Sequence, residues 1–429
     1  MSNDIITASE GLLKKIDSIA KFGSKYKIYP FQELTRTTAE MKELADTLPD
    51  IETPQNQDQL IQSELKRRLK GEILNLEQMI NPKHYDFNTL ISMYGIPQSD
   101  LDGLRGWLEE NREKTQEAIE RLYKTKEIQN YELGLPLDIP SVRRQSEEFA
   151  TVHIQKYHKA LGKLLQELTQ VGEYLRDINA VPTTNGRSYF RPLTNTLAIG
   201  IPAICFTTED GSLQIKERDL INLYGHEGMG HALNQIITNT NNLPYFLTKH
   251  TNLSTATMES VAQFYQNIIF DDLKNSPETQ KDLGIKHNFE EIHQEAKDIH
   301  QLEEYQAKLS QYAITVLADK NLGTPQDTTT LQKKIDILKE VTIDPAYPLN
   351  IVERNRHSFD SQGNLNPQLV GELIYCAQPV QRALEEFAKQ GITYEGKGRS
   401  IIDSTLLKGF WTPIGYVDNA RIKAQNHPD

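Results

Sequence analysis

The residues that could carry out chemistry lie at positions 226–231, which read HEGMGH. Two neutral imidazoles can hold a metal ion, the ion lowers the pKa of a bound water, and an adjacent carboxylate takes the proton as the water attacks a carbonyl. His226 and His231 would then be metal ligands and Glu227 the general base. The alternative is a chance match in a long chain, so the surrounding sequence must support the interpretation.

The spacing of the two histidines differs by one residue from the common HExxH motif, in which they lie four apart. Residues four apart diverge by about 40° on a regular α-helix, whereas residues five apart, such as His226 and His231, diverge by roughly 140°. The sequence therefore predicts a one-residue π-bulge that brings both rings to one face, and such bulges concentrate at functional sites. Gly228 and Gly230 favour it, because glycine tolerates altered backbone. An undistorted helix would exclude a site held by both rings.

A histidine pair needs a third ligand if one coordination position is to remain for water. Glu259 lies 28 residues after His231 (259 − 231) and stands near the start of the next expected helix, around residues 257–267. It is the natural donor. The alternative interpretation is a carboxylate that only stabilises the helix N-terminus through the macrodipole.

The elements that would position these residues are mostly helices. Apolar residues recur at intervals of three and four along most of the chain. Helices are expected within the ranges 5–129, 140–179, 217–237, 289–317 and 327–341. Residues 196–206 give the clearest strand signal, and Pro202 within them predicts an edge strand. An extended peptide could pair with such an edge, although ordinary packing on the core explains it equally well.

Composition limits the classes of partner. The net charge of −12 disfavours nucleic acid and anionic membranes as partners. No apolar run approaches the ~18 residues of a membrane span, and the first residues lack the pattern of a signal peptide. We therefore expect a cytoplasmic protein that does not bind nucleic acid or membranes. Only Cys205 and Cys376 are present, which argues against a disulfide framework and four-cysteine metal sites.

Three stretches, in order, resemble the motifs of a bacterial family of metallopeptidase-like proteins catalogued as a domain of unknown function. HEGMGH at 226–231 resembles its HExxPGH, one residue shorter and without the proline. ESVAQFY at 259–265 is similar to its EGWALY, without the Gly-Trp, and YCAQPVQ at 375–381 to its YxxxPGQ. The HExxGH spacing matches the dipeptidyl peptidase III family. The position of Glu259 is similar to that of the third ligand in the carboxypeptidase Taq and thimet oligopeptidase families.

All of these families are gluzincins, and the resemblance covers roughly residues 190–385. It implies a mainly α fold: a gluzincin-like helical metallopeptidase with a small β-sheet beside the active-site helix and a cleft between two halves. We expect a helical N-terminal part at 1–180 and a zinc-binding catalytic part at 181–429, or one continuous domain.

The resemblance also implies site residues. It makes His226, His231 and Glu259 ligands of Zn²⁺, and Glu227 the general base. The substrate would be a peptide, and a short one if the cleft is narrow.

Other roles are guesses from residue type. For the donor that stabilises the oxyanion we favour Tyr375, then His357 or Tyr347. Arg382 or Arg356 could hold a terminal carboxylate.

Two other classes of function remain open. One is a helical interaction protein with a vestigial or structural metal site, and the other is a zinc amidohydrolase acting on a non-peptide substrate. Substrate length, endo or exo action and oligomeric state do not follow from the sequence.

Overall fold

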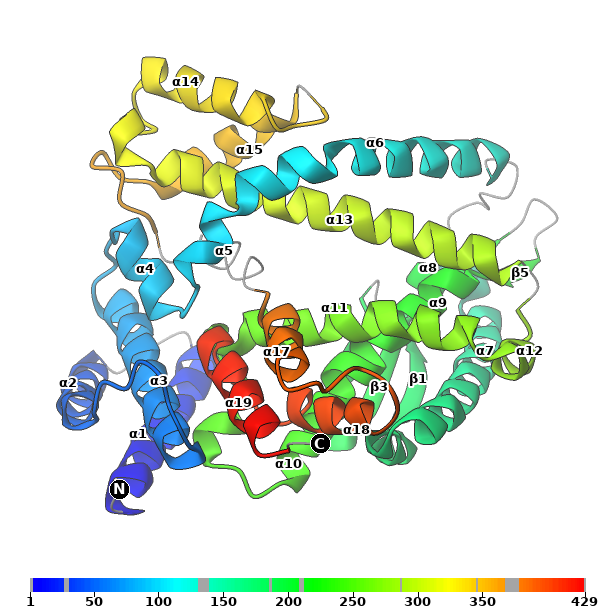
Figure 1. Cartoon of the computed structure of the whole chain (residues 1–429), viewed down its shortest axis with the longest axis horizontal. Helices are drawn as coiled ribbons and strands as arrows, with labels where there is room; N and C mark the ends of the chain where they lie inside the picture. Colours follow the sequence, from blue (N-terminus) through cyan, green and yellow to red (C-terminus); the bar gives the residue numbers. More distant parts are fainter. Residues whose placement is uncertain are drawn as a thin grey trace.

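The described part of the computed structural model is mainly helical, with two small sheets (Figure 1). It comprises residues 3–26, 31–129, 139–184, 187–207, 212–285, 288–344, 346–366 and 378–427. A mainly α fold was predicted, and this coarse prediction is confirmed. Among the helices of these residues, none has the length and apolar character needed to span a membrane.

The first part of the chain forms a series of helices with polar breaks. Asn56 begins the third of them, because its side chain accepts a hydrogen bond from the backbone N–H of Gln59. The helices are α1 (Asn3–Tyr26), α2 (Phe31–Thr47), α3 (Gln57–Ile80), α4 (Phe87–Met93), α5 (Gln98–Asp102), α6 (Leu104–Gln129) and α7 (Ile139–Leu168), followed by the 3₁₀ segment η1 (Gln170–Asp177).

A three-stranded sheet follows, with β1 (Asn179–Thr183), β2 (Tyr189–Arg191) and β3 (Thr196–Gly200) in the order β1-β3-β2. The short 3₁₀ segment η2 (Pro192–Thr194) lies between β2 and β3. β1 pairs with β3 in parallel and β2 pairs with β3 antiparallel. A small sheet beside the motif helix was predicted, and β3 does contact that helix, at Leu197.

The prediction of one edge strand over residues 196–206 is wrong. β3 is the central strand, and the chain then makes the short helix α8 (Ile201–Ile204) before the two-stranded sheet of β4 (Cys205–Thr207) and β5 (Leu213–Ile215). Pro202 lies in the first turn of α8. Backbone N–H groups in the first turn of a helix have no partner within the helix, so proline loses no hydrogen bond by lacking one. Pro202 therefore begins a helix instead of marking the edge of a sheet. The edge strand next to the motif helix is β2.

The motif lies in one continuous rod made of α9 (Glu217–Leu223), the π-helix η3 (Tyr224–Ala232) and α10 (Leu233–Thr240). The 3₁₀ turn η4 (Tyr245–Leu247) leads to α11 (Asn252–Lys274), which packs along η3. A capping box between Thr251 and Ser254 fixes the start of α11.

The remaining helices are α12 (Pro277–Leu283), α13 (Phe289–Ala318), α14 (Thr328–Lys339), α15 (Tyr347–Asn355), α17 (Pro379–Ala388), α18 (Gly396–Leu406) and α19 (Pro413–Gln425), with the 3₁₀ turns η5 (Lys320–Leu322) and η6 (Arg356–Ser358). α13 and α6 run side by side, as Figure 1 shows. Arg121 and Asp298 join them in a bidentate pair at 2.8 and 2.9 Å. Pro379 begins α17, and residues 367–377 lie outside the described part.

Buried apolar side chains form two clusters. The larger surrounds η3, α7, α10 and α19, and it takes residues from both sides of the expected boundary at 180/181, such as Leu161 and Tyr224. The smaller lies among α4, α6, α13, α14 and α15. α11 enters both clusters: Leu253 and Ala256 belong to the smaller one, and Val261 and Tyr265 to the larger. Glu259 therefore lies on α11 between the two cores.

Candidate metal centre

The backbone around the motif is distorted as its spacing predicted. Residues Tyr224–Ala232 form a π-helix, and the backbone N–H of Leu233 bonds to the carbonyl of Gly228 five residues earlier. In this pattern residue i+5 follows residue i along the same face, so His226 and His231 face the same way. The prediction of a π distortion is confirmed, but the distortion spans nine residues rather than a one-residue bulge.

Two glycines of this segment also have a packing role that was not predicted. A Cβ on Gly230 would lie 2.3 Å from Ala262 Cα, and one on Gly225 would lie 2.9 Å from Gln266 Cα. Gly225 and Gly230 are five residues apart and both face α11. Only glycine at these positions lets η3 approach α11 closely enough to bring its histidines to Glu259. Close packing against Ala262 therefore requires glycine at position 230.

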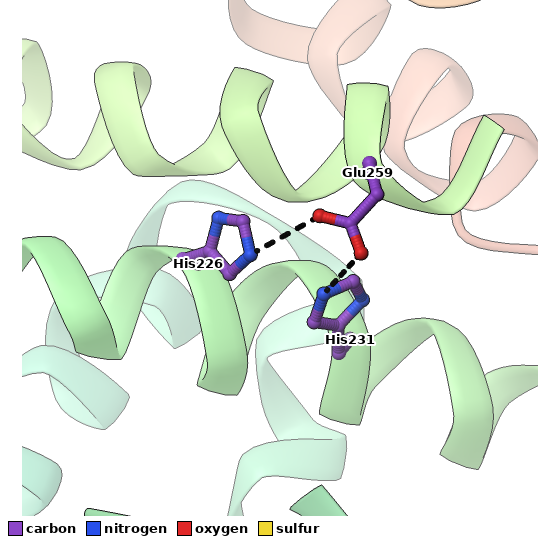
Figure 2. Close-up of side chains that lie close together, drawn as sticks. All are labelled: His226, His231 and Glu259. Carbon is purple, nitrogen blue, oxygen red and sulfur yellow. Dashed lines mark ion pairs between the residues drawn. The ribbon is translucent and has the colours of Figure 1, made fainter. Parts of the chain in front are cut away.

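The three predicted ligands converge (Figure 2). Glu259 places one carboxylate oxygen 3.5 Å from His226 Nε2 and the other 3.6 Å from His231 Nε2. The two imidazole rings meet edge to face, with centroids 4.9 Å apart. All three side chains are partly buried, with 17 to 27% of their surface exposed.

These separations suit a shared cation better than direct hydrogen bonds. An N–H···O bond is normally 2.7–3.2 Å long. Two ligands of one tetrahedral zinc ion, each about 2.0–2.1 Å from it, lie roughly 3.3 Å apart. The observed 3.5 and 3.6 Å are close to that value. Two imidazole nitrogens and one carboxylate are also the donor set of a catalytic zinc site, which keeps a fourth position open. The residues present therefore fit a zinc ion.

Burial and neighbouring charges shift the pKa values of the three ligands in different directions. Burial lowers the pKa of His231 to about 4, so this ring is neutral at pH 7 and able to donate a lone pair. Burial also acts to lower the pKa of His226, but the Glu259 carboxylate outweighs it and the pKa lies above its usual value. Burial acts to raise the pKa of Glu259, yet the neighbouring histidines hold it below its usual value. Glu259 is therefore an anionic ligand at neutral pH.

Glu227 lies next to His226 on η3 and is partly buried. Burial raises the pKa of its carboxyl to about 7, and the charge of Glu259 adds to the rise. A carboxyl with a pKa near the working pH can both accept and release a proton. A cation held by the three ligands would favour the ionised form, which is the form a base needs.

Of the candidates for oxyanion stabilisation and carboxylate binding, the described ones lie on α15, η6 and α17. Tyr375 lies outside the described residues. His357 is exposed on η6, and within the described part of the chain no hydrogen bond or ion pair joins it to the two histidines or to Glu259. Arg382 on α17 pairs with Asp100 on α5, and Arg356 pairs with Glu353 at 2.9 Å. Tyr347 begins α15 and packs against the smaller core.

Sequence reasoning missed two side chains beside the ligands. Gln266 on α11 places Oε1 2.9 Å from His226 Nδ1. It lies seven residues after Glu259 (266 − 259), two helical turns along the same face, and that spacing was a usable signal. His250 precedes the cap of α11, and its Nε2 lies 3.2 Å from Thr255 Oγ1. No sequence signal marks His250, because a tertiary contact places it.

His250 lies close to the ligand face of α11. Its partner Thr255 stands one helical turn before Glu259, and residues four apart on a helix are neighbours on one face. Burial lowers the pKa of His250, and a proton on its ring would lower the pKa of both Glu259 and His231. The Phe410 ring lies edge-on to the imidazole, with centroids 6.2 Å apart. Thr255 and Phe410 thus hold this imidazole near the start of α11, the helix that carries Glu259.

Comparisons of the chain with family models, with curated proteins and with solved structures found no match. The class of protein therefore has to be argued from the site itself.

Proposed function

We propose that this protein is a zinc-dependent metallopeptidase of the gluzincin type, acting on short peptides. The observation that carries the proposal is the meeting of His226, His231 and Glu259, whose ligand atoms all lie within 4.8 Å of one another, while the segment that carries the two histidines also contains Glu227. Metal-assisted amide hydrolysis needs a carboxyl with a shifted pKa next to a donor set of two histidines and one glutamate. The partly buried Glu227 provides such a carboxyl here.

A zinc ion bound there would supply a Lewis acid that polarises a carbonyl and makes a water molecule more acidic. Glu227 would accept the proton of the attacking water and pass it to the leaving amine. His226, His231 and Glu259 would hold the ion in place. As donor of a hydrogen bond to the developing oxyanion we propose His250, beside the earlier candidates Tyr375, His357 and Tyr347.

The sheet beside η3 favours a peptide as substrate. β2 pairs with β3 along one edge, and no described strand pairs with its other edge. β2 also contacts η3. The backbone groups of an edge strand can pair with an extended peptide, and β2 would hold such a peptide beside η3. A non-peptide amide would make no use of this edge.

The test combines metal content with peptide hydrolysis. We expect the purified protein to bind one zinc ion per chain and to cleave members of a quenched fluorescent peptide library. Glu227→Gln should keep the zinc and lose activity by about 10²- to 10⁴-fold, which is the usual contribution of a general base. Glu278→Gln is the matched control, because it makes the same chemical change at an exposed position on α12.

Each result has a defined meaning. Activity that survives Glu227→Gln would rule out the proposed mechanism. Zinc bound without hydrolysis of any peptide would support a structural metal site in a helical interaction protein. Hydrolysis of small amides but not of peptides would support the amidohydrolase alternative.

A further inference from the structure

We propose that Gln266 is a positioning residue that fixes the tautomer of His226 and so prepares its Nε2 to bind a metal ion. This inference rests on the metal site of the proposed function and adds a residue that acts through one of its ligands. A neutral imidazole can donate from one ring nitrogen and accept at the other. Only the nitrogen without the proton can bind a metal ion.

The contact between the two side chains determines which nitrogen carries the proton. His226 Nδ1 lies 2.9 Å from Gln266 Oε1. An amide oxygen only accepts hydrogen bonds, so Nδ1 must donate and therefore holds the proton. Nε2 then keeps its lone pair, and this is the nitrogen that faces Glu259 at 3.5 Å. The neutral ring is therefore oriented, and its tautomer is set, before any ion arrives.

Packing holds Gln266 in place for this role. Only 9% of its surface is exposed. Its Cα lies against Gly225 on η3, where a Cβ would come within 2.9 Å. The same helix supplies Glu259, two turns earlier, so α11 provides both the third ligand and the group that orients the first. The position of Gln266 relative to His226 is thus fixed by the contact that assembles the site.

The second histidine has no such support. His231 Nδ1 is buried, and among the described residues it has no hydrogen-bond partner. The two rings are therefore held unequally, and His226 is the ligand whose geometry is set in advance. Groups that orient a ligand in this way typically contribute 10- to 100-fold to metal affinity. We expect an effect of that size from Gln266.

The chemistry of the side chain at position 266 predicts how zinc affinity should change in a series of variants. Gln266→Met keeps the length and packing of the side chain but offers no strong acceptor, so zinc affinity should fall by about 10- to 100-fold. Gln266→Glu restores an acceptor and should keep or increase the affinity, because a carboxylate makes the imidazole a stronger ligand. Gln263→Met is the matched control, since Gln263 lies on the same helix with its side chain exposed.

Two measurements test the proposal. Zinc affinity of each apo protein is measured by competition with a chromophoric chelator. The tautomer of His226 is measured by ¹⁵N NMR of the zinc-free protein at a pH where the ring is neutral. We expect the proton on Nδ1 in the wild type and in Gln266→Glu, and a shift toward Nε2 in Gln266→Met. A change of packing alone would not move the proton from one nitrogen to the other.

The outcomes separate this inference from the proposed function. Wild-type affinity in Gln266→Met, or an Nε2 proton on His226 in the wild type, would overturn the role of Gln266. If the wild type bound no zinc, the proposed function would fail, while the NMR of the apo protein would still decide the role of Gln266. Should Gln266→Met fail to fold, the wild-type and Gln266→Glu spectra decide it.

Discussion

Replacing Gly230 with alanine tests whether the close approach of η3 and α11 builds the metal site. The added methyl group would lie 2.3 Å from Ala262 Cα and 2.7 Å from Ala262 Cβ. Carbon atoms in contact are normally about 3.5–4.0 Å apart, so the two helices would have to separate by roughly 1 Å. Backbone, not a flexible side-chain tip, causes the clash. Glu259 lies on the helix that would move.

The expected loss of zinc affinity can be calculated from the cost of overpacking the interface between η3 and α11. Adding a methylene to a well-packed interface costs about 1–3 kcal/mol. If the helices move apart to relieve it, zinc binding must bring them back together, because metal bonds tolerate only about 0.2 Å of change. The same energy is then lost from binding. At 1.4 kcal/mol per factor of ten, zinc affinity should fall by about 5- to 150-fold.

The assay is chelator competition for zinc, with thermal unfolding of the apo protein measured in parallel. Gly228→Ala is the matched control on the same π-helix. Its methyl group would first meet Leu197 Cδ2, the tip of a movable side chain, at 3.2 Å. Both variants gain the helix propensity of alanine, about 1 kcal/mol over glycine. Any difference between them therefore reports the contact with α11.

We expect Gly228→Ala to bind zinc almost as the wild type does and Gly230→Ala to bind it much more weakly. Equal zinc affinities in both variants would show that the helix approach does not position Glu259. The reasoning about the glycines would then be refuted.

Three further predictions concern other parts of the molecule. The buried Lys334 Nζ donates hydrogen bonds to the carbonyls of Val316, Leu317 and Asp319 at the end of α13. Lys334→Met should therefore lower the free energy of unfolding by about 2–4 kcal/mol in denaturant titrations. The zinc affinity should stay unchanged. Burial lowers the pKa of Lys334 to about 8, below its unfolded value. The folded state therefore releases this proton first, and the stability of the wild type relative to Lys334→Met should rise between about pH 8 and 10; a constant difference would contradict the role of burial. His250→Ala should reduce kcat for peptide hydrolysis by about 10- to 1,000-fold while zinc stays bound, and unchanged kcat would remove His250 from the mechanism.

The sequence could predict those parts of the site that follow from local geometry and coordination chemistry. Two histidines five residues apart can share a face only on a π-helix, so their spacing implied the distortion. The need for a third donor pointed to Glu259, and that residue does face both rings. Neither inference required knowledge of the tertiary fold.

Features set by contacts between distant segments could not be predicted in this way. The strand expected at residues 196–206 ends at Gly200, because Pro202 suits the first turn of α8 as well as it suits a strand edge. The purpose of Gly230 depends on Ala262, which is 32 residues away (262 − 230). The role of Gln266 depends on which way the His226 ring points. Local patterns do not reveal these contacts, although the seven-residue spacing does place Gln266 on the same helix face as Glu259.

The position of α11 across two hydrophobic clusters has a thermodynamic consequence. Its first turns are held by the cluster around α13, and its later turns by the cluster around η3, with Glu259 between them. An ion bound by Glu259 and both histidines would favour the state in which both clusters are intact. By linkage, a mutation that loosens only the α13 side should weaken zinc binding, and zinc should in turn protect that side from unfolding. Hydrogen exchange of α13 amides, with and without zinc, would therefore respond to an ion that no residue of α13 touches.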